Sequence, residues 1–184
     1  MKCVLKDMPI DADQPFDEAR ESGLCQQLWP GQSRFMIVTG GFTRVLYWHD
    51  GKLACRGGEC FPIGNPASLS RLGLWAIQEM LQAVENIMPL SPLSESLFAH
   101  FNNSIEQVID WSKQARPEDY TRQAKRLLAR RHDDVLSMQL LRRCAGELNE
   151  LLSHPPVSRP DTVWLSGELA AACFPYLDPG GRAP

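Results

Sequence analysis

Hydrophobic and polar positions between residues 34 and 56 alternate in short runs, which is typical of β-strands. Three runs rich in β-branched and aromatic residues, Arg34–Thr39, Phe42–His49 and Lys52–Arg56, are separated by a Gly-Gly and an Asp-Gly dipeptide. Such dipeptides supply the positive φ angles that two-residue hairpin turns need. The pattern therefore predicts an antiparallel meander of three strands.

The two turns also predict the register of this meander. A two-residue loop at Asp50-Gly51 pairs Leu46 with Cys55, and a two-residue loop at Gly40-Gly41 pairs Phe35 with Leu46. Because alternate side chains share one side of a strand, this register predicts a core face that is interrupted mainly by Arg44. The apolar side chains expected on this face are those of Phe35, Ile37, Phe42, Leu46, Trp48, Leu53 and Cys55.

From residue 65 onward the apolar positions recur with a helical period. Asn65 followed by a proline predicts a helix start, and the same cap-plus-proline pattern recurs at 91–92. The first helix is expected to end at Pro89 and the second at Trp111. A third helical region, 117–152, is long enough to be broken at residues 132–134, where the last aspartate would cap a new helix.

Strands first and helices afterwards is the order of an α+β protein, in which helices cover one face of an antiparallel sheet. The predicted fold is a small antiparallel three-stranded meander packed against a bundle of three to five helices. The predicted parts are an acidic N-terminal arm (1–33), a single α+β domain (34–153) and a C-terminal docking segment with a tail (154–184). Within the domain, the meander occupies 34–60 and the helices occupy 65–152.

The composition places few limits on function. The chain of 184 residues has 43% hydrophobic and 22% charged residues and a formal net charge of −3, so its bulk charge does not favour a polyanion partner. We see no signal peptide and no apolar stretch that could span a bilayer, and therefore expect a cytoplasmic protein that does not associate with membranes. In that compartment the six cysteines are expected to be mostly reduced.

One stretch carries several residues with the chemistry of a metal or redox site. His49, Cys55 and Cys60 fall within twelve residues, and Cys55 and Cys60 are the candidate metal or redox-active thiols. The predicted register places His49 and Cys55 on opposite faces, and no second paired cysteine motif completes a zinc site. The spacing also differs from the C-x-x-C of redox motifs. We therefore interpret the stretch as a hairpin, and expect neither a metal nor a cofactor.

A row of cations is the strongest candidate for a binding surface. Five cations fall within ten residues without an acid among them: Arg122, Lys125, Arg126, Arg130 and Arg131. On a helix most of them share one face, which could meet an acidic protein surface or phosphates. A solvated face balanced by nearby acids is the structural alternative. The oligomeric state is not indicated by any pattern.

No enzyme motif is apparent. There is no Walker loop, dinucleotide fingerprint, zinc-protease motif or nucleophile elbow. The glycine pairs are interpreted as turn residues, and a Cys60–His100 nucleophile pair rests on no further pattern. The leading hypothesis is thus a non-enzymatic regulator or adaptor that binds a macromolecule, most simply a protein, through its basic helix. The alternatives are a nucleic-acid-binding regulator that uses 122–131 and a thiol- or metal-dependent protein that uses the two cysteines.

Overall fold

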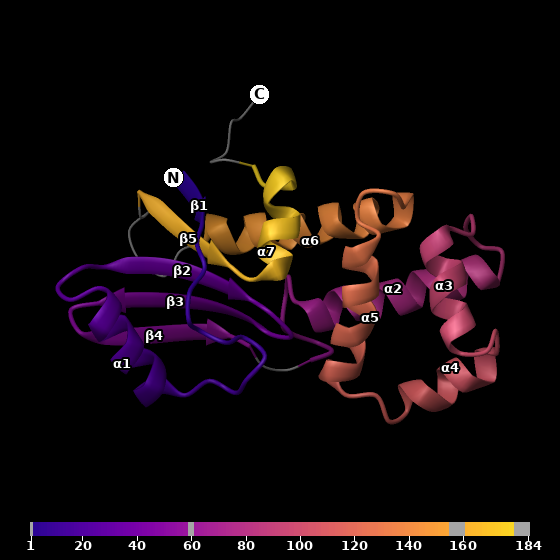
Figure 1. Ribbon diagram of the computed structural model, residues 1–184, viewed down its shortest axis with the longest axis horizontal. Coiled ribbons are helices and arrows are strands. Elements are labelled where there is room, and N and C mark those ends of the chain that lie inside the picture. Colours follow the sequence, from indigo (N-terminus) through magenta and orange to yellow (C-terminus); the bar gives the residue numbers. More distant parts are fainter. Residues whose placement is uncertain (1, 59–60, 155–160, 179–184) are drawn as a thin grey trace.

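A five-stranded mixed sheet forms the centre of the protein, in the order β1-β5-β2-β3-β4 (Figure 1). The structure is a computed structural model that describes residues 2–58, 61–154 and 161–178. The strands are β1 (Lys2–Leu5), β2 (Arg34–Thr39), β3 (Thr43–His49), β4 (Lys52–Gly57) and β5 (Thr162–Ser166). The helices are α1 (Glu18–Leu28), α2 (Leu69–Val84), α3 (Pro92–His100), α4 (Ile105–Ser112), α5 (Pro117–Ala129), α6 (Val135–Ser153) and α7 (Glu168–Cys173), followed by a 3-10 turn at Phe174–Tyr176.

The predicted fold, a three-stranded antiparallel meander with a bundle of three to five helices, is wrong: two further strands extend the meander into a mixed sheet, and the described residues form seven α-helices. β5 runs parallel to both β2 and β1, so that Val163 pairs with Phe35 on one side and with Cys3 on the other. These partners lie far apart in the sequence, and a parallel pair needs a long crossover instead of a tight turn. The turn signals that revealed the hairpins therefore gave no indication of the parallel strands.

The register prediction is confirmed at one turn and wrong at the other. The Asp50-Gly51 turn pairs Leu46 with Cys55, as predicted. At the other turn Thr39 pairs with Thr43, so the loop has three residues, Gly40–Phe42, instead of two. A one-residue slip exchanges the faces of a strand, and the expected pairing of Phe35 with Leu46 is replaced by a pairing with Tyr47.

Both faces of the sheet are consequently buried, each in a separate apolar cluster. Phe35, Ile37 and Val45 pack with residues of α2, α5, α6 and α7. The alternate side chains pack against α1 and the segment before it; this second cluster includes Met36, Val38, Leu46, Trp48 and Leu53. In Figure 1, α1 crosses β3 and β4 while the other helices lie to the opposite side and beyond the strand ends. The predicted single core face is thus divided between two layers.

The helix starts agree with the sequence signals at three of four places. α3 begins at Pro92 after the cap Ser91, α5 begins at Pro117, and α6 begins after the cap Asp134. The first helix instead begins at Leu69 after the cap Ser68.

The expected second helix is broken into α3 and α4. Asn102 and Asn103 lie between the two helices and adopt positive φ angles, which asparagine tolerates better than most residues. Of the predicted C-terminal docking segment and tail (154–184), residues 155–160 and 179–184 lie outside the described residues.

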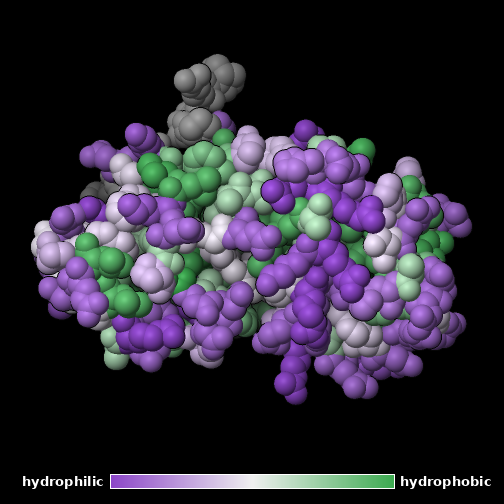
Figure 2. All heavy atoms as spheres, viewed as in Figure 1, coloured by the Kyte–Doolittle hydropathy of each residue, from purple (hydrophilic) through white to green (hydrophobic). Residues whose placement is uncertain are grey.

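The outer surface is polar over much of the face shown in Figure 2, and hydrophilic side chains cover α5 in its middle. Among the described residues, no helix combines the length and the apolarity needed to cross a bilayer.

Candidate functional site

The carboxyl ends of three neighbouring strands meet at one edge of the sheet. β1, β5 and β2 are mutually parallel, so their last residues all face the same side. In sheets with parallel strands this edge is where ligands usually bind. A cavity of about 240 Å³ lies there, and we call it the strand-end cleft. Its lining includes Asp7, Asp11, Asp13, Thr39, Gly40, Lys125, Ser166 and Glu168.

A second hollow of about 200 Å³ adjoins this cleft. Gly41, Phe42, Thr121 and Arg122 line it, and Asp13 and Lys125 line both cavities. The glycine loop Gly40–Phe42, which connects β2 to β3, contributes residues to both hollows.

The ends of β2 and β5 are fixed to each other by Thr39. Its hydroxyl donates to the carbonyl oxygen of Ser166 at 3.0 Å and accepts from the amide of Ala170 at 2.9 Å. Gly167 makes this approach possible, because its φ is +103° and a Cβ at that position would lie 1.9 Å from the carbonyl oxygen of Thr39. The start of α7 is therefore held against the end of β2.

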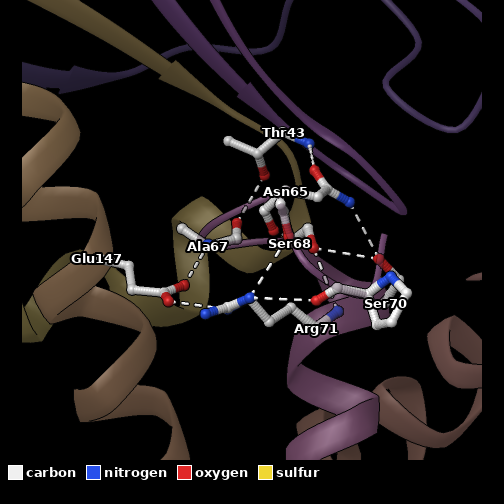
Figure 3. A network of polar contacts seen from close by, with 9 residues as sticks. Thr43, Asn65, Ala67, Ser68, Ser70, Arg71 and Glu147 are labelled. Atoms are coloured by element: carbon white, nitrogen blue, oxygen red, sulfur yellow. Dashed lines mark hydrogen bonds and ion pairs between the residues drawn. The ribbon is translucent and has the colours of Figure 1, made fainter. Parts of the chain in front are cut away.

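A buried polar network supports the glycine loop from the other side (Figure 3). The side-chain oxygen of Asn65 accepts from the amide of Thr43 at 2.8 Å, and its amide nitrogen donates to the carbonyl oxygen of Gly41 at 3.1 Å. The Ser70 hydroxyl donates to the same carbonyl at 2.7 Å. Asn65 thus orders the loop instead of capping α2 as the sequence predicted.

The same network ties the start of α2 to α6. Arg71 pairs with Glu147 at 2.8 Å, and the other carboxylate oxygen of Glu147 accepts from the amide of Ala67 at 2.6 Å. In Figure 3, Arg71 and Glu147 lie below Asn65 and Thr43. Glu147 of α6 thus holds the segment before α2, and Asn65 of that segment holds the glycine loop.

Three aspartates approach the cleft from the segment after β1. The Met8 amide donates to the hydroxyl of Ser166 at 3.2 Å, which fixes this segment at the end of β5. Asp11 accepts from the amide of Asp13 at 2.8 Å, and Asp13 accepts from the amide of Gly41. The Asp7 side chain is exposed and makes no hydrogen bond or ion pair with any described residue. Of these three aspartates, Asp7 is therefore the one whose carboxylate oxygens both remain available to a ligand; Glu168, at the start of α7, also lines the cleft without such a partner.

The structure brings two of the five predicted partner-binding cations to this site. Lys125 lines both hollows, whereas Arg122 lines the second one and pairs with Asp119.

The other three cations are directed elsewhere. Arg126 contacts the ring of His100, where burial and this neighbouring charge lower the pKa of the histidine. Arg131 donates to the carbonyl oxygen of Leu128, and Arg130 is exposed. The predicted partner-binding role of the whole row stays a prediction.

The thiol candidates do not form part of the cleft in the described region. Cys55 is half-buried on β4 and packs against the cluster beneath α1, while Cys60 lies outside the described residues. His49 stacks on Tyr47 and contacts Ser33 at 2.6 Å. Among residues 2–58, 61–154 and 161–178, no three His, Cys, Asp or Glu side chains are grouped as metal binding requires.

The site combines residues that the sequence alone does not connect. We interpreted the glycine pair as a simple turn and the aspartates as part of an acidic arm. A glycine pair at the end of a β-rich run was the available signal, but only the parallel pairing of β1, β5 and β2 brings Asp7 and Lys125 to it.

Among curated proteins, the chain is similar to a glucosamine kinase from Vibrio cholerae. The chain is 28% identical to it over 158 residues, which cover 85% of this chain and 54% of the relative. The chain thus spans about half the length of the curated protein that it matches. No family model matches the sequence.

Two solved structures share the fold. A candidate N-acetylglucosamine kinase from Chromobacterium violaceum superposes with a TM-score of 0.68 at 24% identity, over 86% of this chain and 56% of the other. A candidate N-acetylglucosamine kinase from Porphyromonas gingivalis gives a TM-score of 0.61 at 17% identity, over 83% and 53%. The chain therefore shares the fold of the matched part, slightly more than half, of each of these structures.

These comparisons contradict the hypothesis of a non-enzymatic regulator or adaptor. The curated relative is an enzyme, and both structural neighbours are described as kinases. The absence of the familiar short motifs was a poor guide, because the glycine loop of this fold lies between two antiparallel strands and not at a helix start.

Proposed function

We propose that the chain binds a phosphoryl donor at the strand-end cleft and takes part in phosphoryl transfer to a glucosamine-type sugar. The observation that carries this proposal is the meeting of a glycine loop, a lysine and an unengaged carboxylate at the ends of three parallel strands. The similarity to a glucosamine kinase supports the choice of reaction and of acceptor.

Phosphoryl transfer depends mainly on positioning and on stabilising the charge of the transferred group. Lys125 and Arg122 place positive charge beside the glycine loop, where phosphate oxygens of the donor would lie. Asp7 is the candidate base, because among the three aspartates of the segment after β1 its carboxylate is the one without a partner among the described residues. In the proposed step a sugar hydroxyl attacks the terminal phosphorus, its proton passes to Asp7, and the nucleoside diphosphate leaves.

The chain spans about half of its curated relative, so binding and turnover are tested separately. The protein is incubated with ATP and magnesium, and with either glucosamine or N-acetylglucosamine, while ADP release is followed. We expect sugar-dependent ADP release, and we expect Asp7→Asn to lower it by about 10²-fold or more. Asp50→Asn is the control, since Asp50 lies at the far hairpin and is 84% exposed. Absence of both ATP binding and sugar-dependent ADP release would refute the proposal.

A further inference from the structure

The glycine loop is covered by a segment of the same chain. Of its three amides, Gly41 donates to the carboxylate of Asp13, and Phe42 donates to the carbonyl oxygen of Ala12 at 3.1 Å. Only the amide of Gly40 is satisfied within the loop, by the carbonyl oxygen of Phe42 at 2.7 Å. Two of the three amides that could meet a phosphate are thus engaged by residues 12–13.

The covering segment lies directly against the loop. A Cβ added to Gly40 would lie 2.7 Å from a carboxylate oxygen of Asp13 and 2.8 Å from the Cβ of Ala12. At Gly41 the same carboxylate oxygen would be 3.1 Å away. The carboxylate therefore fills the space through which a ligand would approach the loop backbone.

The backbone on either side of Asp13 is held by hydrogen bonds from a buried arginine of the sheet. Arg44, which is 1% exposed, donates to the carbonyl oxygens of Asp11 and Gln14. It also pairs with the buried carboxylate of Glu21 at 3.3 Å, on α1. The main chain at 11–14 is thus fixed to the sheet, whereas the exposed side chain of Asp13 needs only a change of rotamer to leave the amide.

The Asp13 carboxylate carries a negative charge at the glycine loop, as a bound phosphate would. A carboxylate that accepts from a backbone amide makes a charge-assisted hydrogen bond, as a phosphate oxygen does. Asp13 and the phosphate would also share the nearby charge of Lys125, which lines both hollows with it.

We propose that Asp13 is an internal competitor for anions at the glycine loop, and that a phosphoryl donor binds by displacing its carboxylate from the amide of Gly41. The proposal rests on the proposed function, in that the competing anion is the phosphate of a donor. Affinity for the donor would then be lowered by the fraction of molecules in which Asp13 occupies the loop.

The test is the affinity of the chain for pyrophosphate and for ATP, measured by calorimetry. We expect Asp13→Ala to bind pyrophosphate about tenfold more tightly, because one charge-assisted hydrogen bond no longer has to be broken. Asp13→Asn should fall between wild type and Asp13→Ala. Asp110→Ala is the charge-matched control, since Asp110 is exposed on α4 and pairs with Lys113, which follows that helix. Unchanged or weaker binding by Asp13→Ala would overturn the proposal.

A second measurement uses the wild-type chain, so that its result does not depend on whether the variants fold. In labelled protein titrated with pyrophosphate, the resonances of the Asp13 carboxyl carbon and the Gly41 amide should shift together. A carboxyl resonance that stays in place while pyrophosphate binds would also overturn the proposal. Tighter pyrophosphate binding by Asp13→Ala, together with neither ATP binding nor sugar-dependent ADP release, would refute the proposed function alone.

Discussion

Arg44 is a residue whose unusual position the sequence reveals but whose partners it does not. Its position inside an apolar run is evident from the sequence, and the structure places it on β3 beneath α1. Its guanidinium joins the sheet to the segment that covers the glycine loop and to Glu21. Sequence patterning reveals the charge in the core face, but the partners come from a segment without periodicity, where patterns carry no information.

The first prediction concerns this buried pair. Arg44→Ala should lower the free energy of unfolding by about 3–5 kcal/mol, because it leaves the carboxylate of Glu21 buried without its partner. Urea denaturation of the variant and the wild type measures the difference.

Arg20→Ala is the matched control for this prediction. Arg20 contacts the same carboxylate at 3.6 Å, but its side chain is 47% exposed. Its removal should change stability by less than about 0.5 kcal/mol. Equal losses in the two variants would show that the contact with Glu21 does not depend on burial.

At the scale of elements, signals within a few residues correctly predicted where three helices begin. The proline starts of α3 and α5 and the capping aspartate of α6 are encoded within a few residues. The Asp134 carboxylate also accepts from the amide of Leu93 at 2.9 Å, which joins the start of α3 to that of α6. Burial alone would raise the pKa of Asp134, but the amides of Ser137 and Leu93 outweigh it and lower the pKa.

The two strands of the parallel part of the sheet, β1 and β5, could not be predicted from such local signals. β5 has only five residues, Thr162–Ser166, and pairs with strands more than a hundred residues away in the sequence. Nothing in a short apolar run specifies a parallel partner, because no turn constrains the two strands to each other.

The second prediction concerns the crossing of α2 and α5. Gly73 lies where the helices touch, and a Cβ there would be 1.9 Å from the carbonyl oxygen of Tyr120. Gly73→Ala should therefore destabilise the protein by about 1–3 kcal/mol, since the helices must move apart. Thermal unfolding followed by circular dichroism measures the change.

In contrast to Gly73→Ala, Gly146→Ala on α6 is expected to stabilise the protein. A Cβ at this helical position would meet nothing within 4 Å. Alanine should stabilise the helix there by about 0.5–1 kcal/mol, because it restricts the unfolded chain more than glycine does. Stabilisation by both substitutions would contradict the close helix crossing.

At the scale of the whole molecule, the site depends on long-range pairing more than on any motif. The glycine loop comes from the meander, Asp7 from the segment after β1, and Lys125 from the basic row of α5. Each was visible in the sequence with a different interpretation: turn, acidic arm and partner surface. Only the arrangement of parallel strands turns these three separate features into one cleft, which is why this candidate site could not be predicted.

The last prediction separates the cleft from the rest of the basic row. Lys125→Ala should weaken pyrophosphate binding about tenfold, because Lys125 lines both hollows and forms no ion pair with the described residues. Arg130→Ala removes an equal charge from the exposed end of α5, outside the lining of both hollows, and should leave binding unchanged. Calorimetry at two salt concentrations distinguishes a local contact from a diffuse field, since screening weakens the latter more. Equal losses of pyrophosphate affinity in the two variants would assign anion binding to the whole cationic face of α5. Such a result would contradict the proposal that the strand-end cleft binds the donor.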